Sequence, residues 1–245
     1  MSASDRPSQR RNAARTAVVW DALERVLEDP GAYNEERARV VDIGGGTGGF
    51  AVHMAELGHT VIVVDPSPDA LAALGRRAAE CGVTDRVTGV QGDVDGLVDL
   101  VDEADLVLCH GVLEVVDDPA AALATIATVL RPGGVLSLLV AQRHAAVVAR
   151  AMAGHFQQAL ALLDDPAATG RGRRYTADEV AALLADAGFT VEATQAVRVF
   201  ADLVPGSLLD LEPGATAALV DLERAVAGRP EYLPLATQVH LLATR

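Results

Sequence analysis

The sequence contains no lysine, because all 20 of its basic residues are arginine. A chain without lysine cannot hold pyridoxal phosphate as a Schiff base, and it has no P-loop lysine to contact a nucleotide phosphate. It also lacks the lysine that a Tyr-x-x-x-Lys reductase needs. Arginine is therefore the only permanent cation that this chain offers to an acidic ligand or substrate.

Cysteine and metal-ligand patterns are sparse as well. Cys81 and Cys109 are the only cysteines, which is typical of reduced thiols in a cytosolic protein. The six histidines are scattered along the chain, so we expect no metal site. No apolar segment follows the arginines of residues 1–20, so we expect no signal peptide, and the apolar stretch 132–142 is too short to span a bilayer. These patterns favour a cytoplasmic protein that does not bind membranes.

The chain is acidic, with a formal net charge of −14, but its charge is unevenly distributed. Residues 1–20 and residues 141–175 each sum to +3, and the remainder is acidic. An acidic body repels nucleic acid, whereas the two basic segments either form a local landing surface for it or are solvated loops. The arginines of segment 171–174 are likewise either phosphate contacts or part of an exposed loop.

The pattern of apolar residues predicts the fold class. Half of the 245 residues are hydrophobic, which suits one α/β domain with a large core. Short apolar segments alternate with helical patterns, which predicts βαβ units and a parallel sheet. The expected strands are 39–43, 60–64, 86–91, 104–109, 135–140, 189–200 and 236–243. We therefore predict a Rossmann-like, doubly wound sheet of seven strands whose last hairpin is antiparallel.

We expect one domain over residues 1–245 with four parts. These parts are an N-terminal helical arm (1–30), a cofactor-binding core (38–142), a helical lid or insert (143–175) and the C-terminal part of the sheet (176–245). One alanine-rich helix is expected over 143–163. Thr176 and Glu179 form a capping box that predicts the start of the next helix.

A glycine-rich turn follows the first expected strand. Gly44-x-Gly46-x-x-Gly49 satisfies the dinucleotide-binding fingerprint, and Asp65 lies 21 residues after Gly44, where a ribose-binding acid belongs. The glycines alone therefore permit a nicotinamide cofactor. Asp42 argues against it, because an acid just before the glycines suits a ligand with an ammonium group better than a pyrophosphate. Two acids that flank one glycine turn favour ligand binding over simple capping of a turn or helix.

Four motifs then occur in a fixed order along the chain. They are Asp42-Ile-Gly-Gly-Gly-Thr-Gly48, Val-Val-Asp65-Pro-Ser, Gln91-Gly-Asp93 and Leu130-Arg-Pro-Gly-Gly-Val135. Together they resemble the motifs of class I S-adenosylmethionine-dependent methyltransferases, over roughly residues 15–142. The resemblance implies an enzyme that uses S-adenosyl-L-methionine, with a pocket over the carboxyl ends of strands one, two and four.

A narrower resemblance covers most of the chain. Four further segments carry it: Trp20-Asp-x-Leu-x-Arg-Val-Leu27, Cys109-His-Gly-Val-Leu-Glu114, Pro132-Gly-Gly-Val-Leu-Ser-Leu138 and Val197-Arg-Val-Phe-Ala-Asp202. They resemble the tRNA 5-carboxymethoxyuridine methyltransferases, which esterify the carboxylate of a modified wobble uridine. The residues that the resemblance assigns to the cofactor are Arg15, Asp42, Gly44, Gly45, Gly46, Asp65, Pro66, Gly92, Asp93 and His110.

The chemistry of the acceptor selects further candidates. A carboxylate is ionised at neutral pH, so it needs no general base, but it does need a cationic clamp, and arginine pairs bidentately with carboxylate. Arg198 is the first choice and Arg143 the second; the alternative for each is an ion pair at the surface or a strand edge. His110 is a general base if the acceptor is a hydroxyl, and otherwise only packs beside the cofactor.

Three functions remain open from the sequence. The first is methylation of a modified wobble uridine of tRNA. The second is methylation of a small molecule such as a sugar, a natural product or a free acid, which the acidic charge favours. The third is a non-catalytic or NAD-binding module of the same fold.

Overall fold

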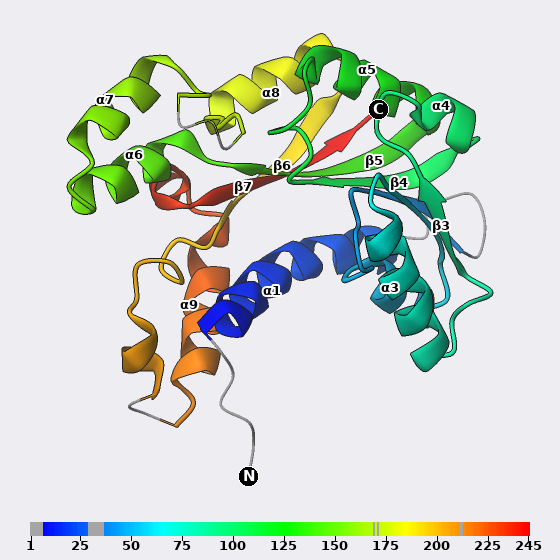
Figure 1. Cartoon of the computed structure of the whole chain (residues 1–245), viewed down its shortest axis with the longest axis horizontal. Coiled ribbons are helices and arrows are strands. Elements are labelled where there is room, and N and C mark those ends of the chain that lie inside the picture. The colour runs from blue at the N-terminus through cyan, green and yellow to red at the C-terminus, as the bar shows by residue number, and fades with distance from the viewer. Residues whose placement is uncertain (1–6, 29–36, 169, 171, 211–212) are drawn as a thin grey trace. The chain divides into compact units, whose positions relative to one another are not determined.

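The computed structural model describes residues 7–28, 37–168, 170, 172–210 and 213–245 (Figure 1). Its strands are β1 (Arg39–Ile43), β2 (Thr60–Asp65), β3 (Val87–Gln91), β4 (Ala104–His110), β5 (Leu130–Ala141), β6 (Thr190–Val197) and β7 (Gln238–Thr244). Its α-helices are α1 (Pro7–Glu28), α2 (Ala51–Glu56), α3 (Pro68–Glu80), α4 (Leu97–Leu100), α5 (Pro119–Val129), α6 (Arg143–Met152), α7 (Phe156–Asp164), α8 (Ala177–Asp186) and α9 (Ala215–Ala227), and the 3-10 helices are η1 (Gly206–Asp210) and η2 (Pro230–Leu235).

The strands form one seven-stranded sheet in the order β3-β2-β1-β4-β5-β7-β6. β1 pairs in parallel with β2 and β4, β2 pairs in parallel with β3, and β4 pairs in parallel with β5. The chain reverses its winding direction between β3 and β4, so β1 and β4 are neighbours at the point where open α/β sheets bind ligands. This is the α/β, doubly wound, seven-stranded fold predicted from the sequence.

The last strand runs antiparallel to its neighbours. The N–H of Gly133 donates to the carbonyl of Arg245, and the N–H of Gln142 donates to that of Thr237, so residue numbers on β5 and β7 rise in opposite directions. On the other side of β7, Thr244 contacts Glu192 and His240 contacts Gln195. The sheet is therefore mixed, and the predicted antiparallel hairpin is confirmed.

By its internal contacts the chain divides into two compact units. The strand-rich unit contains Arg25–Leu139, Val180–Ala193 and Leu241–Arg245, and the helical unit contains Met1–Glu24, Val140–Glu179 and Thr194–His240. The four-part division expected from the sequence stays a prediction.

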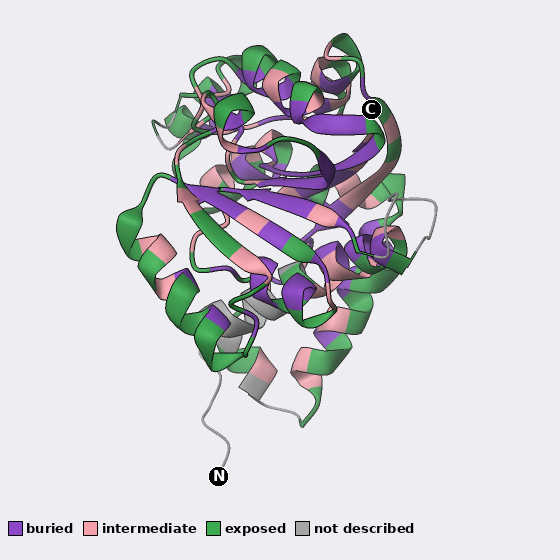
Figure 2. Cartoon of the chain, turned by 90° about the vertical axis from the view of Figure 1, so that its right-hand side faces the viewer, coloured by how far each residue is buried: buried purple, intermediate pink, exposed green. Residues whose placement is uncertain are grey.

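In the strand-rich unit, helices cover both faces of the strands; α3 lies on one face and α4 and α5 on the other (Figure 1). The strands are mostly buried and the helices expose their outer faces (Figure 2). β4 is apolar over most of its length and buried up to Cys109, as expected for a central strand covered on both faces. The helix starts follow from local chemistry, because Ser67 caps α3 and Asp118 caps α5, each before a proline at the first helical position.

One helix that the sequence predicts as continuous is interrupted. The pattern over 143–163 predicts one helix, but the structure has α6 and α7, separated at Gly154, whose φ is 77°. A glycine in the left-handed conformation ends a helix in the way that a C-terminal cap does. The sequence also predicts a helical segment over 207–227 with an interruption at Pro213-Gly214, and the structure has η1 and α9 there. None of the helices in the described part of the chain is long and apolar enough to cross a membrane.

Candidate active site

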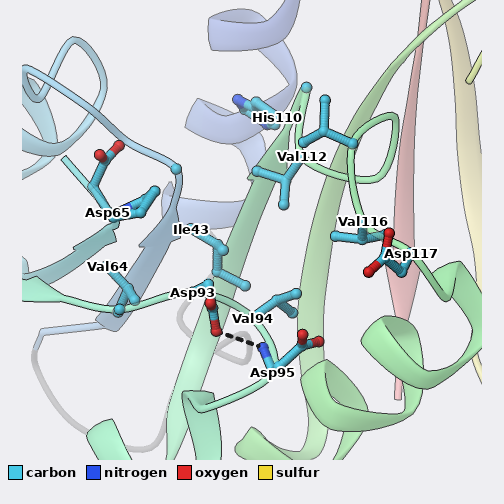
Figure 3. A pocket seen from close by; sticks show the side chains of 15 residues that line it. Ile43, Val64, Asp65, Asp93, Val94, Asp95, His110, Val112, Val116 and Asp117 are labelled. Atoms are coloured by element: carbon cyan, nitrogen blue, oxygen red, sulfur yellow. Dashed lines mark hydrogen bonds between the residues drawn. The ribbon is translucent and has the colours of Figure 1, made fainter. Parts of the chain in front are cut away.

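A cavity of about 390 Å³ opens at the carboxyl ends of β1, β2, β3 and β4 in the strand-rich unit. Its lining residues are Ile43, Gly44, Val64, Asp65, Pro66, Gly92, Asp93, Val94, Asp95, His110, Gly111, Val112, Val115, Val116 and Asp117. Figure 3 shows Asp65 on one side of this cavity and Asp117 on the other, with His110 and Val112 between them. The cavity therefore combines an apolar floor with carboxylates at its rim.

The glycine turn after β1 brings main chain to the cavity wall. Gly44 has a φ of 67°, and its N–H donates to the carbonyl of Val64 at 2.7 Å, which ties the end of β1 to the end of β2. A side chain on Gly44 would collide with Val112, and one on Gly45 would collide with the carboxyl group of Asp42. The turn is therefore built for close approach of a ligand to bare backbone.

Asp65 is the acid that the sequence assigns to a ribose. Its Oδ2 accepts a hydrogen bond from the N–H of Gly46 at 2.9 Å, and its Oδ1 accepts one from the N–H of Ser67 at 2.9 Å. Each carboxylate oxygen has a second lone pair, so the two remaining acceptor positions suit the two hydroxyls of a ribose. The glycine turn and the start of α3 thus orient this carboxylate at the cavity.

Asp42 lies behind the glycine turn rather than on the cavity wall. Its side chain is 3% exposed, and burial together with the negative charge of Asp65 raises the pKa of Asp42 to about 7. A cation bound near the turn would favour the ionised form of Asp42. The carboxylate is therefore suited to a ligand with an ammonium or sulfonium group.

We expect the replacement Asp42→Asn to change the pH dependence of stability. From pH 4 to 7 the folded state keeps the proton on Asp42 while the unfolded chain has lost it, so the free energy of unfolding falls as the pH rises. Asparagine carries no such proton. Relative to wild type, the variant should therefore gain about 2–3 kcal/mol between pH 5 and pH 8 in denaturant titrations.

The effect of Asp42 is obtained by subtracting the pH profile of the free energy of unfolding of Asp42→Asn from that of wild type. Burial lowers the pKa of His240 to about 3, so this group makes the protein more stable as the pH rises toward neutrality, which opposes the effect of Asp42. Subtracting the two profiles removes this contribution. Asp69→Asn, an exposed change in the first turn of α3, is the control, and a constant difference between Asp42→Asn and wild type would contradict the assignment.

His110 ends β4 and lines the cavity. Its Nε2 lies 2.9 Å from Oγ of Ser137 on β5, and its ring meets the ring of Phe50 edge-on at 5.2 Å between centroids. These contacts hold the imidazole at the cavity wall in a defined orientation. Its role as a general base for a hydroxyl acceptor stays a prediction.

The loops after β3 and β4 supply residues that the sequence analysis missed. The resemblance assigns Asp93 to the cofactor. Its Oδ1 accepts from the N–H of Asp95 at 3.2 Å, and Val94 and Asp95 line the cavity (Figure 3). Val112, Val116 and Asp117 close the other side. The sequence pattern suggests that Glu114, Asp117 and Asp118 cap the helix that begins near Pro119. In the structure Asp118 caps α5, whereas Asp117 lines the cavity.

A second cavity, also of about 390 Å³, lies in the helical unit. Its lining residues are Ala141, Gln142, Ala145, Ala146, Ala149, Arg150, Arg174, Arg198, Asp202, Thr237 and Gln238. Three arginines and one carboxylate give this cavity a positive charge. We call it the arginine pocket.

Of the two arginines that the sequence analysis proposes as a clamp for a carboxylate, Arg198 lines the arginine pocket and Arg143 does not. Arg198 lines the arginine pocket and also donates from Nη2 to Asp202. Arg143, the first residue of α6, lies outside that lining, and its Nη2 donates to Glu179 in the first turn of α8. Arg15 lies within α1, but its side chain is outside the described residues, so its assignment to the cofactor stays a prediction.

The residues of the first cavity fit S-adenosylmethionine. Asp65 has free lone pairs for a ribose, valines offer a slot for a flat base, and the bare glycine turn beside Asp42 admits a positively charged amino-acid group. A doubly wound sheet with an antiparallel last strand, this turn and Asp65, together with Asp42 before the glycines, is the arrangement of a class I S-adenosylmethionine-dependent methyltransferase.

The comparisons with known proteins agree with that class. Residues 9–194 match the family described as "Methyltransferase domain". The chain is 32% identical over 234 residues to the tRNA 5-carboxymethoxyuridine methyltransferase of Escherichia coli K12, covering 94% of this chain and 88% of the relative. The solved magnesium protoporphyrin IX methyltransferase of Synechocystis PCC 6803 with bound SAH covers 100% of this chain and 90% of its own, with 16% identity and a TM-score of 0.66. A methyltransferase from Mesorhizobium loti gives a TM-score of 0.59 at 20% identity, covering 95% of this chain and 100% of its own.

The chain therefore belongs to the S-adenosylmethionine-dependent methyltransferases, in the family that includes the Escherichia coli tRNA enzyme. Its cofactor is S-adenosylmethionine, and the comparisons do not favour the nicotinamide alternative that the glycine spacing permits. Among the described residues, no group of three histidine, cysteine or acidic side chains is arranged to hold a metal ion.

Proposed function

We propose that this enzyme methylates the carboxylate of a modified wobble uridine in tRNA, and that the arginine pocket holds that carboxylate. The supporting observation is a pair of buried donors. Arg150 and Arg198 line the pocket, and the Nε–H of each is buried without an acceptor among the described residues. A buried donor without an acceptor is costly, so the pocket is suited to an anionic ligand that accepts from both.

The rest of the pocket suits a flat heterocycle attached to that anion. Four alanines leave space along one side: Ala141, Ala145, Ala146 and Ala149. Gln142, Thr237 and Gln238 add groups that both donate and accept hydrogen bonds. The 32% identical relative is named for such an acceptor, 5-carboxymethoxyuridine in tRNA. An acceptor of this kind also implies that the enzyme acts in the cytoplasm.

The proposed reaction needs alignment more than acid–base chemistry. Bound S-adenosylmethionine supplies a methyl group that its sulfonium has already activated. The carboxylate is ionised at neutral pH, so the residues of the chain bind, orient and keep water away. Positioning of this kind contributes about 7–11 kcal/mol to the lowering of a barrier. His110 then serves as part of the wall beside the cofactor.

A small carboxylic acid is the second candidate acceptor, because the net charge of −14 disfavours a polyanion such as tRNA. Arginine clamps do not distinguish a free acid from a carboxylate on a nucleoside. The two candidates therefore share the reaction and differ in the molecule that carries the carboxylate.

Mass spectrometry of nucleosides separates the two candidates. Purified enzyme and labelled S-adenosylmethionine are incubated with total tRNA from a strain without the gene, and in parallel with a small-molecule extract. We expect one methyl group to appear on a carboxymethoxy uridine and to be released by mild alkali, as esters are. An alkali-stable methyl group, or label only in the small-molecule fraction, would exclude the tRNA carboxylate; heat-treated enzyme is the control.

A further inference from the structure

The loop after β6 carries Arg198 in an unusual conformation. Arg198 has a φ of 60°, and it is the only described residue other than glycine with a positive φ. A side chain in the left-handed region is strained, and glycine is the residue that normally occupies it. Arginine at this position therefore indicates that the side chain is needed where the loop puts it.

Glu223 on α9 fixes the main chain of this loop. Its carboxylate accepts three hydrogen bonds from consecutive backbone N–H groups: Val199 at 2.8 Å, Phe200 at 2.9 Å and Ala201 at 2.7 Å. The side chain of Glu223 is fully buried. Successive N–H groups form a concave anion site, and a carboxylate that occupies it holds the backbone in one shape.

Thr237, the residue just before β7, holds the other side of the Arg198 loop. The N–H of Thr237 donates to the carbonyl of Arg198 at 3.2 Å, and the hydroxyl of Thr237 donates to Oδ2 of Asp202 at 2.8 Å. Asp202 in turn accepts from Nη2 of Arg198. The guanidinium is thus held at one nitrogen, while its buried Nε–H has no acceptor among the described residues.

We propose that Glu223 is a positioning residue, which holds the strained loop so that Arg198 presents its guanidinium to the acceptor carboxylate. The inference rests on the proposed function, because it gives Arg198 its ligand. Glu223 itself lies outside the lining of the arginine pocket and acts through the backbone of residues 199–201. It is therefore a determinant of acceptor binding and not of cofactor binding.

The replacement Glu223→Gln tests this role with little change of size. The amide group of glutamine places a donor against N–H donors, so the loop loses part of its anchor. We expect the KM for the acceptor tRNA to rise at least tenfold, with kcat and the Kd for S-adenosylmethionine within twofold of wild type. Asp221→Asn, an exposed carboxyl-to-amide change on the same helix, is the matched control and should leave all three values within twofold.

A double-mutant cycle separates positioning from a general loss of structure. In an Arg198→Gly background the side chain to be positioned is gone, so E223Q should change the KM less than twofold. An equal rise of KM in both backgrounds, or no rise in either, would overturn the proposal. If E223Q does not fold, Glu223→Asp takes its place, because the shorter carboxylate cannot reach all three donors and should give the same pattern.

Failure of the proposed function would show separately, as a wild-type enzyme that esterifies no tRNA. In that case NMR can measure the exchange rate of the arginine Nε–H protons, which reports the position of the Arg198 side chain without an activity assay. The Nε–H of Arg198 should be protected in wild type and should exchange at least tenfold faster in E223Q, while that of Arg150 stays unchanged. Equal protection of Arg198 in both proteins would overturn the inference.

Discussion

Replacing Asp65 with alanine is expected to weaken the binding of S-adenosylmethionine at least about 100-fold. A hydrogen bond to a charged group contributes about 1.5–3 kcal/mol, and the two open lone pairs of this carboxylate match the two hydroxyls of a ribose. Loss of both contacts therefore corresponds to about 3–6 kcal/mol, or two to four powers of ten in Kd. Isothermal titration calorimetry measures the effect directly.

The alanine variant also removes the anchor of Gly46 and Ser67, so a loss of affinity has two possible origins. A cofactor analogue without its 2′-hydroxyl distinguishes them. If Asp65 contacts the ribose, the analogue binds more weakly than S-adenosylmethionine to wild type but equally well to Asp65→Ala. Asp69→Ala, an exposed change four residues along the chain, is the control. An affinity of Asp65→Ala within threefold of wild type would refute the ribose assignment.

Local signals predicted several elements in both units well. β1 occupies Arg39–Ile43 as expected, because a short apolar run that ends in glycines has few alternative structures. α3 begins after Ser67, where a capping side chain precedes a proline. The capping box of α8 is also confirmed, since Thr176 and Glu179 exchange hydrogen bonds. In each case the determining residues lie within one turn or one strand of each other.

The arginine pocket could not be read from the sequence. Its arginines come from α6, from the segment before α8 and from the loop after β6, at positions 150, 174 and 198. Only tertiary structure brings such distant positions together. The sequence favoured an exposed loop for Arg174, and it gave no sign that Glu223, on a helix 25 residues after Arg198, would hold the backbone of its loop.

The sequence carries no signal for the left-handed turn at Arg198. The segment Val197-Arg-Val-Phe-Ala-Asp202 has no glycine at the position whose φ is 60°. Turn prediction depends on glycine or asparagine at such positions, so a strained arginine is invisible to it. The same strain supports the proposed role of Arg198, because strained non-glycine residues cluster at binding sites.

Replacing Arg198 with glycine is therefore expected to separate activity from stability. The kcat/KM for the tRNA acceptor should fall about 10- to 100-fold, because a hydrogen bond between the guanidinium and a carboxylate contributes about 1.5–3 kcal/mol. The free energy of unfolding should stay within about 1 kcal/mol of wild type. Relief of the left-handed strain offsets the greater freedom of glycine in the unfolded chain and the loss of the partly exposed ion pair with Asp202.

This combination distinguishes a binding arginine from a structural one. If Arg198 served the fold through Asp202, the glycine variant would lose stability and activity together. Arg224→Gly provides the comparison, because Arg224 forms an exposed ion pair with Asp21 and lies outside the arginine pocket. That variant should have a lower free energy of unfolding, because it places a glycine inside α9. Its KM for the acceptor should be unchanged. An Arg198→Gly enzyme with wild-type kcat/KM would remove the arginine pocket as the site of the acceptor carboxylate.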